Sequence, residues 1–473
     1  MSEDRPRPSE SALDAIRARL ARELPDGSVI ADPDLLEAYA EDYSFSGRYL
    51  PDLVVRASTT EDVARVMRAA SHHGVPVTPR GLGSGKAGGA LPIYGGIVLS
   101  LERMRRLKEI SRDDMVAVAE PGIVTADLMA AVEAEHLFYP PDPNSLKISS
   151  LGGNVACNSG GPRALKYGVT RNYVLALEIV TPTGDILRVG HRPIKGVAGY
   201  DLAGLIVGSE GTLAVITEIT ARLVPLPSAI ETALVSFADL ETASVAITRV
   251  FGRGIVPRTL EFLDTYALNA VRKKTPGRFP ENAGAVLILE TDAASEDAAR
   301  AELERAASVC LELGALDVLV AQTEAQREKI WEPRRVLSMT LAETAPMKIS
   351  EDVSVPRSRI PELLAASHQI GRTLGIDLAT YGHAGDGNIH VNFLFDEPRK
   401  EAAHRAAAEV MAKAVELGGT ISGEHGIGIA KKRFLSLEQS EPLIELQRRL
   451  KSVFDPHNVL NPGKIFPSRG VRE

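Results

Sequence analysis

The chain has 473 residues, of which 44% are hydrophobic and 25% charged, a balance that excludes wholesale disorder and is sufficient for a core without disulfides. Acidic residues outnumber basic ones, 62 to 54, which argues against a nucleic-acid-binding surface. There are two cysteines and no run of about 18 apolar residues, so we expect neither a disulfide framework nor a membrane-spanning helix.

Residues 1–46 predict a helical N-terminal segment. This segment lacks the apolar core of a secretion signal, so we expect a cytoplasmic protein. Peripheral attachment to a membrane through a partner is left open. In residues 47–227, short strands such as 53–55 and 97–100 alternate with helices and glycine-rich turns, which indicates an α+β domain. A capping box is predicted at Ser58–Glu61, before the first helix of this domain.

The Pro225-Leu-Pro227 sequence predicts a domain boundary. Residues 228–440 follow as a second α+β domain, with long helices at 295–314 and 400–417. Residues 441–473 predict a helix and a tail that returns to the first domain.

Three segments of the first domain are unusually rich in glycine. In the first, 79–89, Arg80 and Ala87 stand where a Walker A loop needs Gly and Ser or Thr, and no helix is expected after the G-x-G-x-x-G match at Gly83–Gly88. The others lie at 140–161 and 208–212. Each alone is consistent with a tight turn, but three in one domain favour one large cofactor that carries phosphate.

Two glycine-flanked segments of the second domain contain histidine. Strands at 381–383 and 389–395, joined by Gly-Asp-Gly-Asn, predict a hairpin that brings His383 close to His390. With Glu424 they would form a catalytic metal site of the His₂Glu kind, and the adjacent His425 would be placed to accept a proton. A single histidine is usually structural, but three of the ten in the chain gather here, which favours a site.

Cations precede this hairpin at Arg334, Arg335 and Lys348. Arginine suits bidentate carboxylate binding and lysine supplies a point charge, although a solvated charged helix would explain the same pattern. If the substrate carries a second carboxylate, we expect Arg335 or Lys348 to bind it.

These motifs, with Asn461-Pro-Gly-Lys464 near the end, resemble the FAD-linked oxidases of the D-2-hydroxyacid dehydrogenase type. That family includes the glycolate oxidase flavin subunit, D-lactate dehydrogenase and D-2-hydroxyglutarate dehydrogenase. The resemblance covers about residues 30–466. It implies a vanillyl-alcohol-oxidase/PCMH-type FAD-binding domain followed by an α+β substrate (cap) domain of the FAD-linked oxidase C-terminal type.

The resemblance also assigns residues to the cofactors. It implies noncovalent FAD, because the first glycine loop lacks the histidine through which some relatives attach it. The residues implied for FAD are Arg80, Gly81, Leu82, Gly83, Ser84, Gly85, Gly88, Pro141, Asp142, Ser149, Gly152, Gly153, Asn154, Ser159, Gly160, Gly161, Ile216 and Asn461. The implied metal ligands, usually for zinc, are His383, His390 and Glu424.

By the same resemblance, Arg334 and Lys348 bind the substrate carboxylate, Asn392 contacts the substrate and His425 is the catalytic base. The expected reaction oxidises a small D-2-hydroxyacid to the 2-keto acid. The electron acceptor is left open between a quinone, an electron-transfer flavoprotein, a cytochrome and a partner subunit, and so is a homodimer.

The sequence leaves three alternatives open. One is a flavin subunit of the glycolate oxidase kind, active only in a complex. A second is a metal-dependent hydrolase, which leaves the glycine-rich segments unexplained. The third is a non-catalytic flavin-binding protein, which the complete set of polar site residues disfavours.

Overall fold

The computed structural model describes residues 5–468, which divide into two compact units. Unit 1 consists of the chain up to Ser159, Val169–Leu226 and the chain from His425 onward. Unit 2 consists of Gly160–Gly168 and Pro227–Glu424. The chain thus returns to unit 1 at His425, whereas the sequence placed this return at residue 441. No local sequence pattern predicts where the chain returns to unit 1, because this return depends on backbone hydrogen bonds between residues far apart in the chain.

Unit 1 contains a four-stranded sheet in the order β1-β2-β4-β3. Its strands are β1 (Val29–Ile30), β2 (Leu53–Arg56), β3 (Val77–Arg80) and β4 (Ile97–Ser100), and its helices are α1 (Glu10–Glu23), α2 (Pro33–Leu36), η1 (Glu37–Tyr39) and α3 (Thr60–His73). β2, β4 and β3 run parallel, and β2 and β4 are apolar and buried along almost their whole length, as is typical of covered parallel strands. Ile16 and Leu20 of α1 pack into the same core as Met67 of α3.

The second sheet of unit 1 has five antiparallel strands in the order β5-β6-β10-β8-β9. They are β5 (Leu107–Ser111), β6 (Val116–Ala119), β8 (Val174–Val180), β9 (Ile186–Gly190) and β10 (Val215–Arg222). Around it lie α4 (Thr125–Glu133), α5 (Leu151–Cys157), η2 (Thr170–Tyr173), α7 (Leu202–Ile206) and the paired strands β7 (Leu137–Phe138) and β11 (Val224–Pro225).

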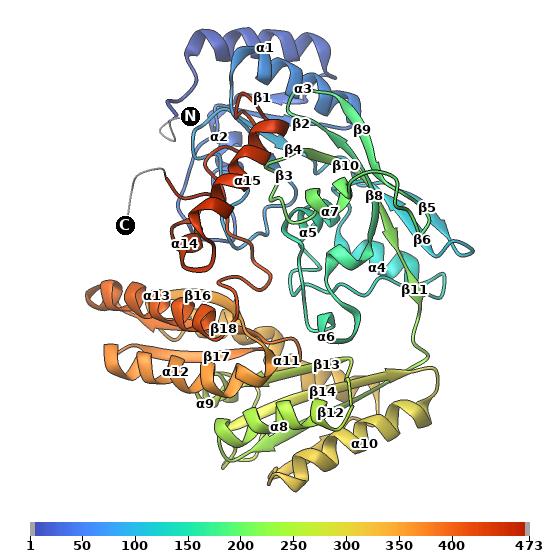
Figure 1. Cartoon of the computed structure of the whole chain (residues 1–473), viewed down its shortest axis with the longest axis vertical. Coiled ribbons are helices and arrows are strands. Elements are labelled where there is room, and N and C mark those ends of the chain that lie inside the picture. Colours follow the sequence, from blue (N-terminus) through green and yellow to red (C-terminus); the bar gives the residue numbers. More distant parts are fainter. Residues whose placement is uncertain (1–4, 469–473) are drawn as a thin grey trace. The chain divides into compact units, whose positions relative to one another are not determined.

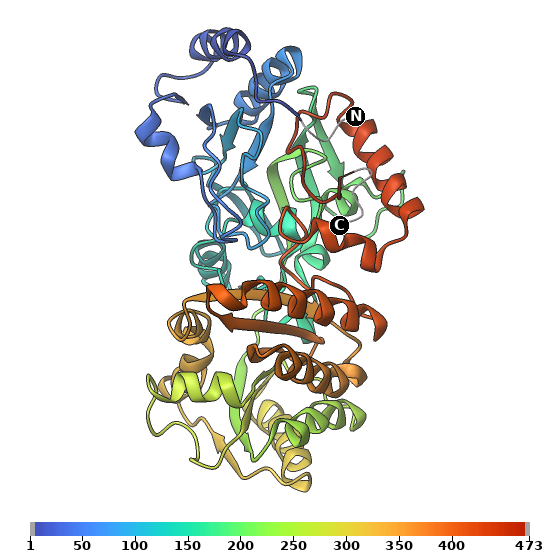
Figure 2. The same cartoon turned by 90° about the vertical axis from the view of Figure 1, so that its left-hand side faces the viewer.

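The C-terminal segment completes unit 1. It contains η5 (Lys432–Phe434), α14 (Leu435–Glu438) and α15 (Glu441–Phe454), which Figure 2 shows in red. After α15, Leu460 pairs in parallel with Val77, so the end of the described chain extends the edge of the four-stranded sheet at β3.

Unit 2 is built on a seven-stranded antiparallel sheet in the order β15-β12-β14-β13-β17-β18-β16 (Figure 1). Its strands are β12 (Ala229–Phe237), β13 (Thr259–Leu263), β14 (Ala285–Ala293), β15 (Asp317–Val320), β16 (Met347–Ser354), β17 (Asp377–His383) and β18 (Asn388–Phe395). The predicted hairpin is confirmed as β17 and β18.

Helices surround this sheet. They are α6 (Ala164–Tyr167), α8 (Leu240–Gly252), α9 (Thr265–Arg272), α10 (Glu296–Glu312), α11 (Glu324–Ala342), η3 (Arg357–Arg359), α12 (Ile360–Leu374), η4 (Glu397–Arg399) and α13 (Lys400–Glu416). Leu268 of α9 and Leu337 of α11 share a core with Leu263, Ile288 and Tyr381 of the sheet. Because side chains alternate between faces of a strand, these strand residues define the face that α9 and α11 cover.

Within the described residues, no helix is both long and apolar enough to cross a membrane.

Candidate active site

Three side chains of unit 2 form a compact ligand set. His383 ends β17 and His390 lies on β18, so the hairpin brings their rings within 5.2 Å, centre to centre. Glu424 completes the set, because its Oε1 lies 3.5 Å from the Nε2 of each histidine. Two imidazole nitrogens and one carboxylate oxygen in this arrangement fit a divalent metal such as zinc and leave coordination positions open.

Glu261 on β13 contacts this set through the second ring nitrogen of His383. It pairs across the strands with His383, and its Oε1 lies 2.5 Å from His383 Nδ1. A carboxylate on Nδ1 orients the ring and leaves Nε2 for a metal. Burial alone would raise the pKa of Glu261, but the charges of His383 and Arg334 outweigh it and lower that pKa to about 2. Glu261 is therefore ionised.

The same carboxylates act on His383. Burial opposes its protonation, but Glu261 and Glu424 together raise the pKa of His383 well above its ordinary value. Two anions thus surround this ring, which is the environment that a bound cation also requires.

Asp352 fixes the loop of the third ligand. It lies on β16 opposite His390, is fully buried, and accepts a 2.7 Å hydrogen bond from the Glu424 backbone N–H. Asp352 and Glu261 were not predicted from the sequence. Glu261 is the only charged residue of β13, whereas β16 holds several polar residues besides Asp352, so strand pairing alone shows which histidine each one faces.

Arg334 on α11 is joined to the ligand set through Glu261. Its Nε donates to Glu261 Oε2 at 2.7 Å, and its guanidinium lies over the Tyr381 ring, 4.8 Å from the centroid. Its Nη1 is buried and lacks a hydrogen-bond partner, and so does Oδ1 of Asn392 on β18, two residues after His390. A buried donor and a buried acceptor therefore remain without a partner near the His-His-Glu set, where a bound ligand could satisfy both.

In unit 1 the first two glycine-rich segments meet. A Cβ on Gly81 would lie 2.2 Å from Ser150 Oγ, and one on Gly152 would lie 2.5 Å from Pro121 Cβ. Gly83 and Gly88 have φ angles of +73° and +76°. Only glycine tolerates these close approaches and dihedrals, which leave backbone N–H groups accessible to phosphate. The chain therefore fits the pyrophosphate of a dinucleotide at this place.

Comparisons with known proteins find a matching family for each half of the chain. A FAD-binding-domain model matches residues 51–190, and the model of the C-terminal domain of FAD linked oxidases matches residues 226–465. Glycolate oxidase subunit GlcD of Bacillus subtilis is 42% identical, covering 90% of this chain and 92% of the relative. D-lactate dehydrogenase of Anaerostipes hadrus is 34% identical, covering 94% and 96%.

The chain belongs to the FAD-linked oxidase family. Its fold is also found among solved structures: it superimposes on p-cresol methylhydroxylase with a TM-score of 0.79 and 16% identity, covering 97% of each chain. The predicted fold class, a PCMH-type FAD-binding domain followed by an FAD-linked oxidase C-terminal domain, is confirmed. The enzyme is therefore an FAD-dependent oxidoreductase.

Two further cations of this FAD-linked oxidase have different surroundings. Lys348 on β16 is partly buried and donates to the Ser338 carbonyl oxygen at 2.9 Å. Arg335 is half exposed and pairs with Glu328, because consecutive helix residues project about 100° apart. Arg335 is therefore engaged by Glu328 outside the ligand set, and the binding of a second substrate carboxylate by Arg335 or Lys348 stays a prediction.

The residues expected to hold FAD fall into different settings. Ser149 and Asn154 both hydrogen-bond to Thr125 at the start of α4, so they attach the second glycine-rich segment to that helix. Ile216 is buried on β10, and Asn461 donates to backbone carbonyl oxygens of unit 1. Gly160 and Gly161 group with unit 2, whereas every other residue expected to hold FAD groups with unit 1. The FAD contacts themselves stay predictions.

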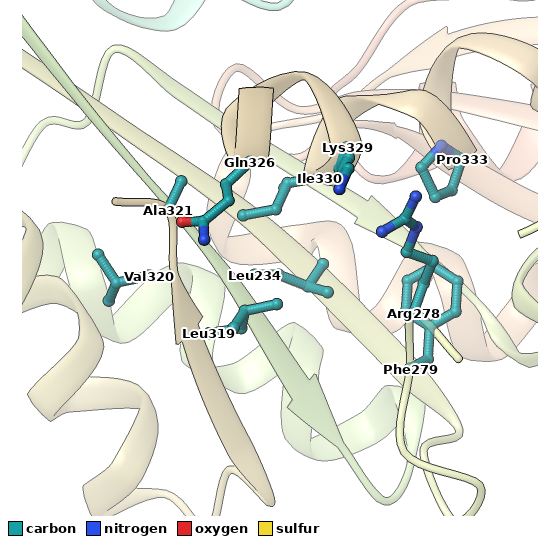
Figure 3. Close-up of a pocket in the computed structure, with 10 residues that line it drawn as sticks. All are labelled: Leu234, Arg278, Phe279, Leu319, Val320, Ala321, Gln326, Lys329, Ile330 and Pro333. Atoms are coloured by element: carbon teal, nitrogen blue, oxygen red, sulfur yellow. The ribbon is translucent and has the colours of Figure 1, made fainter. Parts of the chain in front are cut away.

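A separate cavity of about 240 Å³ opens at the β15 edge of the unit 2 sheet (Figure 3). Its lining residues are Leu234, Arg278, Phe279, Leu319, Val320, Ala321, Gln326, Lys329, Ile330 and Pro333. α11 contributes the last four, and Arg334 follows them directly in sequence. The cavity contains none of the ligand set, so the site described above is distinct from it.

Proposed function

We propose that this FAD-linked oxidase oxidises a D-2-hydroxyacid of the glycolate, D-lactate or D-2-hydroxyglutarate class to the 2-keto acid. The observation that carries the proposal is the chain of contacts from the His-His-Glu set through Glu261 to Arg334, whose Nη1 is buried without a partner. A 2-hydroxyacid offers what this arrangement needs, a hydroxyl oxygen beside a carboxylate.

Each polar residue has a part in the proposed reaction. Arg334 and Lys348 bind and orient the carboxylate, and the Asn392 side chain hydrogen-bonds to the substrate. His425, which directly follows the ligand Glu424, accepts the hydroxyl proton on an imidazole nitrogen. When bound, the metal lowers the pKa of the substrate hydroxyl and FAD accepts the hydride of the α carbon.

FAD in this proposal is noncovalent. The 79–89 segment contains no histidine, and Lys86 of that segment lies over the Tyr43 ring, 5.4 Å from its centroid. Burial lowers the pKa of Lys86. An anionic pyrophosphate bound in this region would oppose that shift and favour the protonated ammonium form of Lys86.

The test is to mix the oxidised enzyme anaerobically with a panel of D- and L-2-hydroxyacids and to follow the flavin absorbance. We expect one D-acid to bleach the flavin rapidly and its L-enantiomer to have no effect. Removal of the metal by a chelator should abolish bleaching, and added zinc should restore it. A metal-loaded, FAD-containing enzyme that no 2-hydroxyacid reduces would contradict the proposal.

A second candidate is favoured by the relative in Bacillus subtilis, which is named a glycolate oxidase subunit. In that case the chain would reduce its own flavin but pass the electrons on only within a complex. The same panel separates the two candidates, because a subunit would bleach once and then fail to turn over with soluble quinones or oxygen.

A further inference from the structure

Glu210, in the third glycine-rich segment, binds the loop that follows Glu424. Its side chain is buried, and its two carboxylate oxygens accept hydrogen bonds from the backbone N–H groups of Ile427 at 2.8 Å and Gly428 at 2.7 Å. All three residues belong to unit 1. These bonds hold the chain two and three residues after His425.

The backbone of Glu210 is itself fixed from two sides. Its N–H donates to the Ala156 carbonyl oxygen at 2.8 Å, which joins it to α5. Its carbonyl oxygen accepts from Asn461 Nδ2 at 2.8 Å, and the same amide group donates to Gly89 O at 3.0 Å. Glu210 therefore joins the first two glycine-rich segments and the C-terminal Asn461 motif to the loop of His425.

The space around the carboxylate is closed. Gly426 has a φ of +86°, and a Cβ there would lie 3.0 Å from Glu210 Cδ. Burial raises the pKa of Glu210, whereas the N–H groups of Ile427 and Gly428 and the nearby Lys464 oppose the rise. Burying this carboxylate costs desolvation free energy. Hydrogen bonds from two adjacent backbone N–H groups, one to each oxygen, offset that cost.

We propose that Glu210 is a positioning residue, which fixes the loop 425–428 to the FAD-binding unit and thereby fixes the catalytic base His425. Glu210 bonds to the backbone of that loop and acts on the reaction through His425 alone. The inference rests on the proposed function for the role of His425. The attachment of the loop is independent of that role and has its own readout.

The first experiment measures amide hydrogen exchange of peptides spanning 425–431 in the FAD-loaded wild type and in Glu210→Gln. Glutamine keeps the shape but replaces one acceptor oxygen with an NH₂ group that repels an amide N–H. We expect exchange in these peptides to rise about tenfold, the effect of losing one charge-assisted hydrogen bond. Unchanged exchange would overturn the proposal.

The matched control is Glu120→Gln. Glu120 is also buried in unit 1 and accepts a backbone hydrogen bond, from Arg106 N–H at 2.9 Å. Within residues 5–468 its hydrogen bonds go to Arg106 and not to the loop, so we expect the substitution to leave exchange at 425–431 unchanged. Equal loosening by both substitutions would assign the effect to general destabilisation and overturn the specific role of Glu210.

The second experiment uses flavin reduction by the best D-acid. In Glu210→Gln we expect the reduction rate constant to fall at least tenfold, with little change in substrate Kd, because Arg334 and Lys348 are untouched. Gly426→Ala, which crowds the carboxylate from the loop side, should likewise lower the reduction rate constant with little change in substrate Kd. A faster-exchanging loop with an unchanged reduction rate would overturn the link to His425.

A failure of the proposed function would give a different experimental result from a failure of the role of Glu210. If no 2-hydroxyacid reduces the wild-type flavin, the reaction is wrong, and the exchange experiment still decides whether Glu210 holds the loop.

Discussion

At the scale of single residues, one carboxylate has two tasks. Glu261 bonds His383 through one oxygen and Arg334 through the other, so it orients two side chains of the candidate site together. Arg334 and Glu261 are 3% and 0% exposed, so neither charge is solvated and each needs the other. This explains why a carboxylate is kept inside a buried strand.

Glu261→Gln tests this arrangement. The amide cannot accept from both partners as a charged carboxylate does, so we expect metal affinity to fall about 10- to 100-fold. Competition against a chromophoric chelator measures it. Glu231→Gln is the control, because Glu231 lies on β12 and pairs with Arg300. Equal metal affinity in Glu261→Gln and the wild type would show that His383 needs no supporting carboxylate.

At the scale of elements, the start of α3 differs by one residue from its prediction. The sequence predicted a capping box at Ser58 and Glu61, but Thr59 is the N-cap, and its side chain and Asp62 cap each other. Both Ser58-x-x-Glu61 and Thr59-x-x-Asp62 satisfy the spacing, so the pattern alone is ambiguous. The burial of Asp62 and Val63 decides between them, because it fixes the rotation of the helix.

Thr59→Ala and Ser58→Ala form a matched pair for this helix. Loss of the Thr59 cap should lower the free energy of unfolding by about 1 kcal/mol, since it leaves the Asp62 N–H without its acceptor. Ser58→Ala should change it by well under half that amount. Denaturant unfolding followed by circular dichroism measures both. A larger effect from Ser58→Ala would return the cap to the predicted position.

At the scale of the whole molecule, the short segment 160–168 joins unit 2 although the chain on both sides of it belongs to unit 1. Lys166 and Tyr167 of this segment bond to Asp292 on β14, which also pairs with Arg258 at 2.9 Å. Burial alone would raise the pKa of Asp292, but the hydrogen bonds from Lys166 and Tyr167 and the charge of Arg258 outweigh it and lower that pKa.

Asp292→Asn should therefore destabilise unit 2 in a pH-dependent way. At neutral pH we expect a loss of about 1–3 kcal/mol, because Arg258 loses one of its two buried carboxylate partners and keeps only Glu290. A carboxyl group with a lowered folded-state pKa stabilises the fold above its unfolded pKa, and this contribution disappears as the pH falls. The difference between variant and wild type should thus shrink below about pH 4 in urea unfolding series.

The exposed Asp377 provides the control, since it carries the same charge on a strand of the same sheet. Asp377→Asn should change stability by less than about 0.5 kcal/mol at any pH. A pH-independent difference for Asp292→Asn would show that shape, not charge, holds the segment.

The sequence by itself determined the family, the fold class and most elements. The β17–β18 hairpin and helices α10, α13 and α15 lie where periodicity and turn residues predict them, because such elements depend on neighbours a few residues apart. The proximity of His383 and His390 was also readable, since one short turn joins their strands.

Only the tertiary structure decided what surrounds these residues. Glu261 meets His383 from 122 positions away, and Asp352 meets Glu424 from 72 positions away. Arg334 is buried at the site and Arg335 is solvated, although the two are adjacent in sequence. Strand register and helix rotation produce these differences. Both are set by packing between distant segments, which no local pattern of residues encodes.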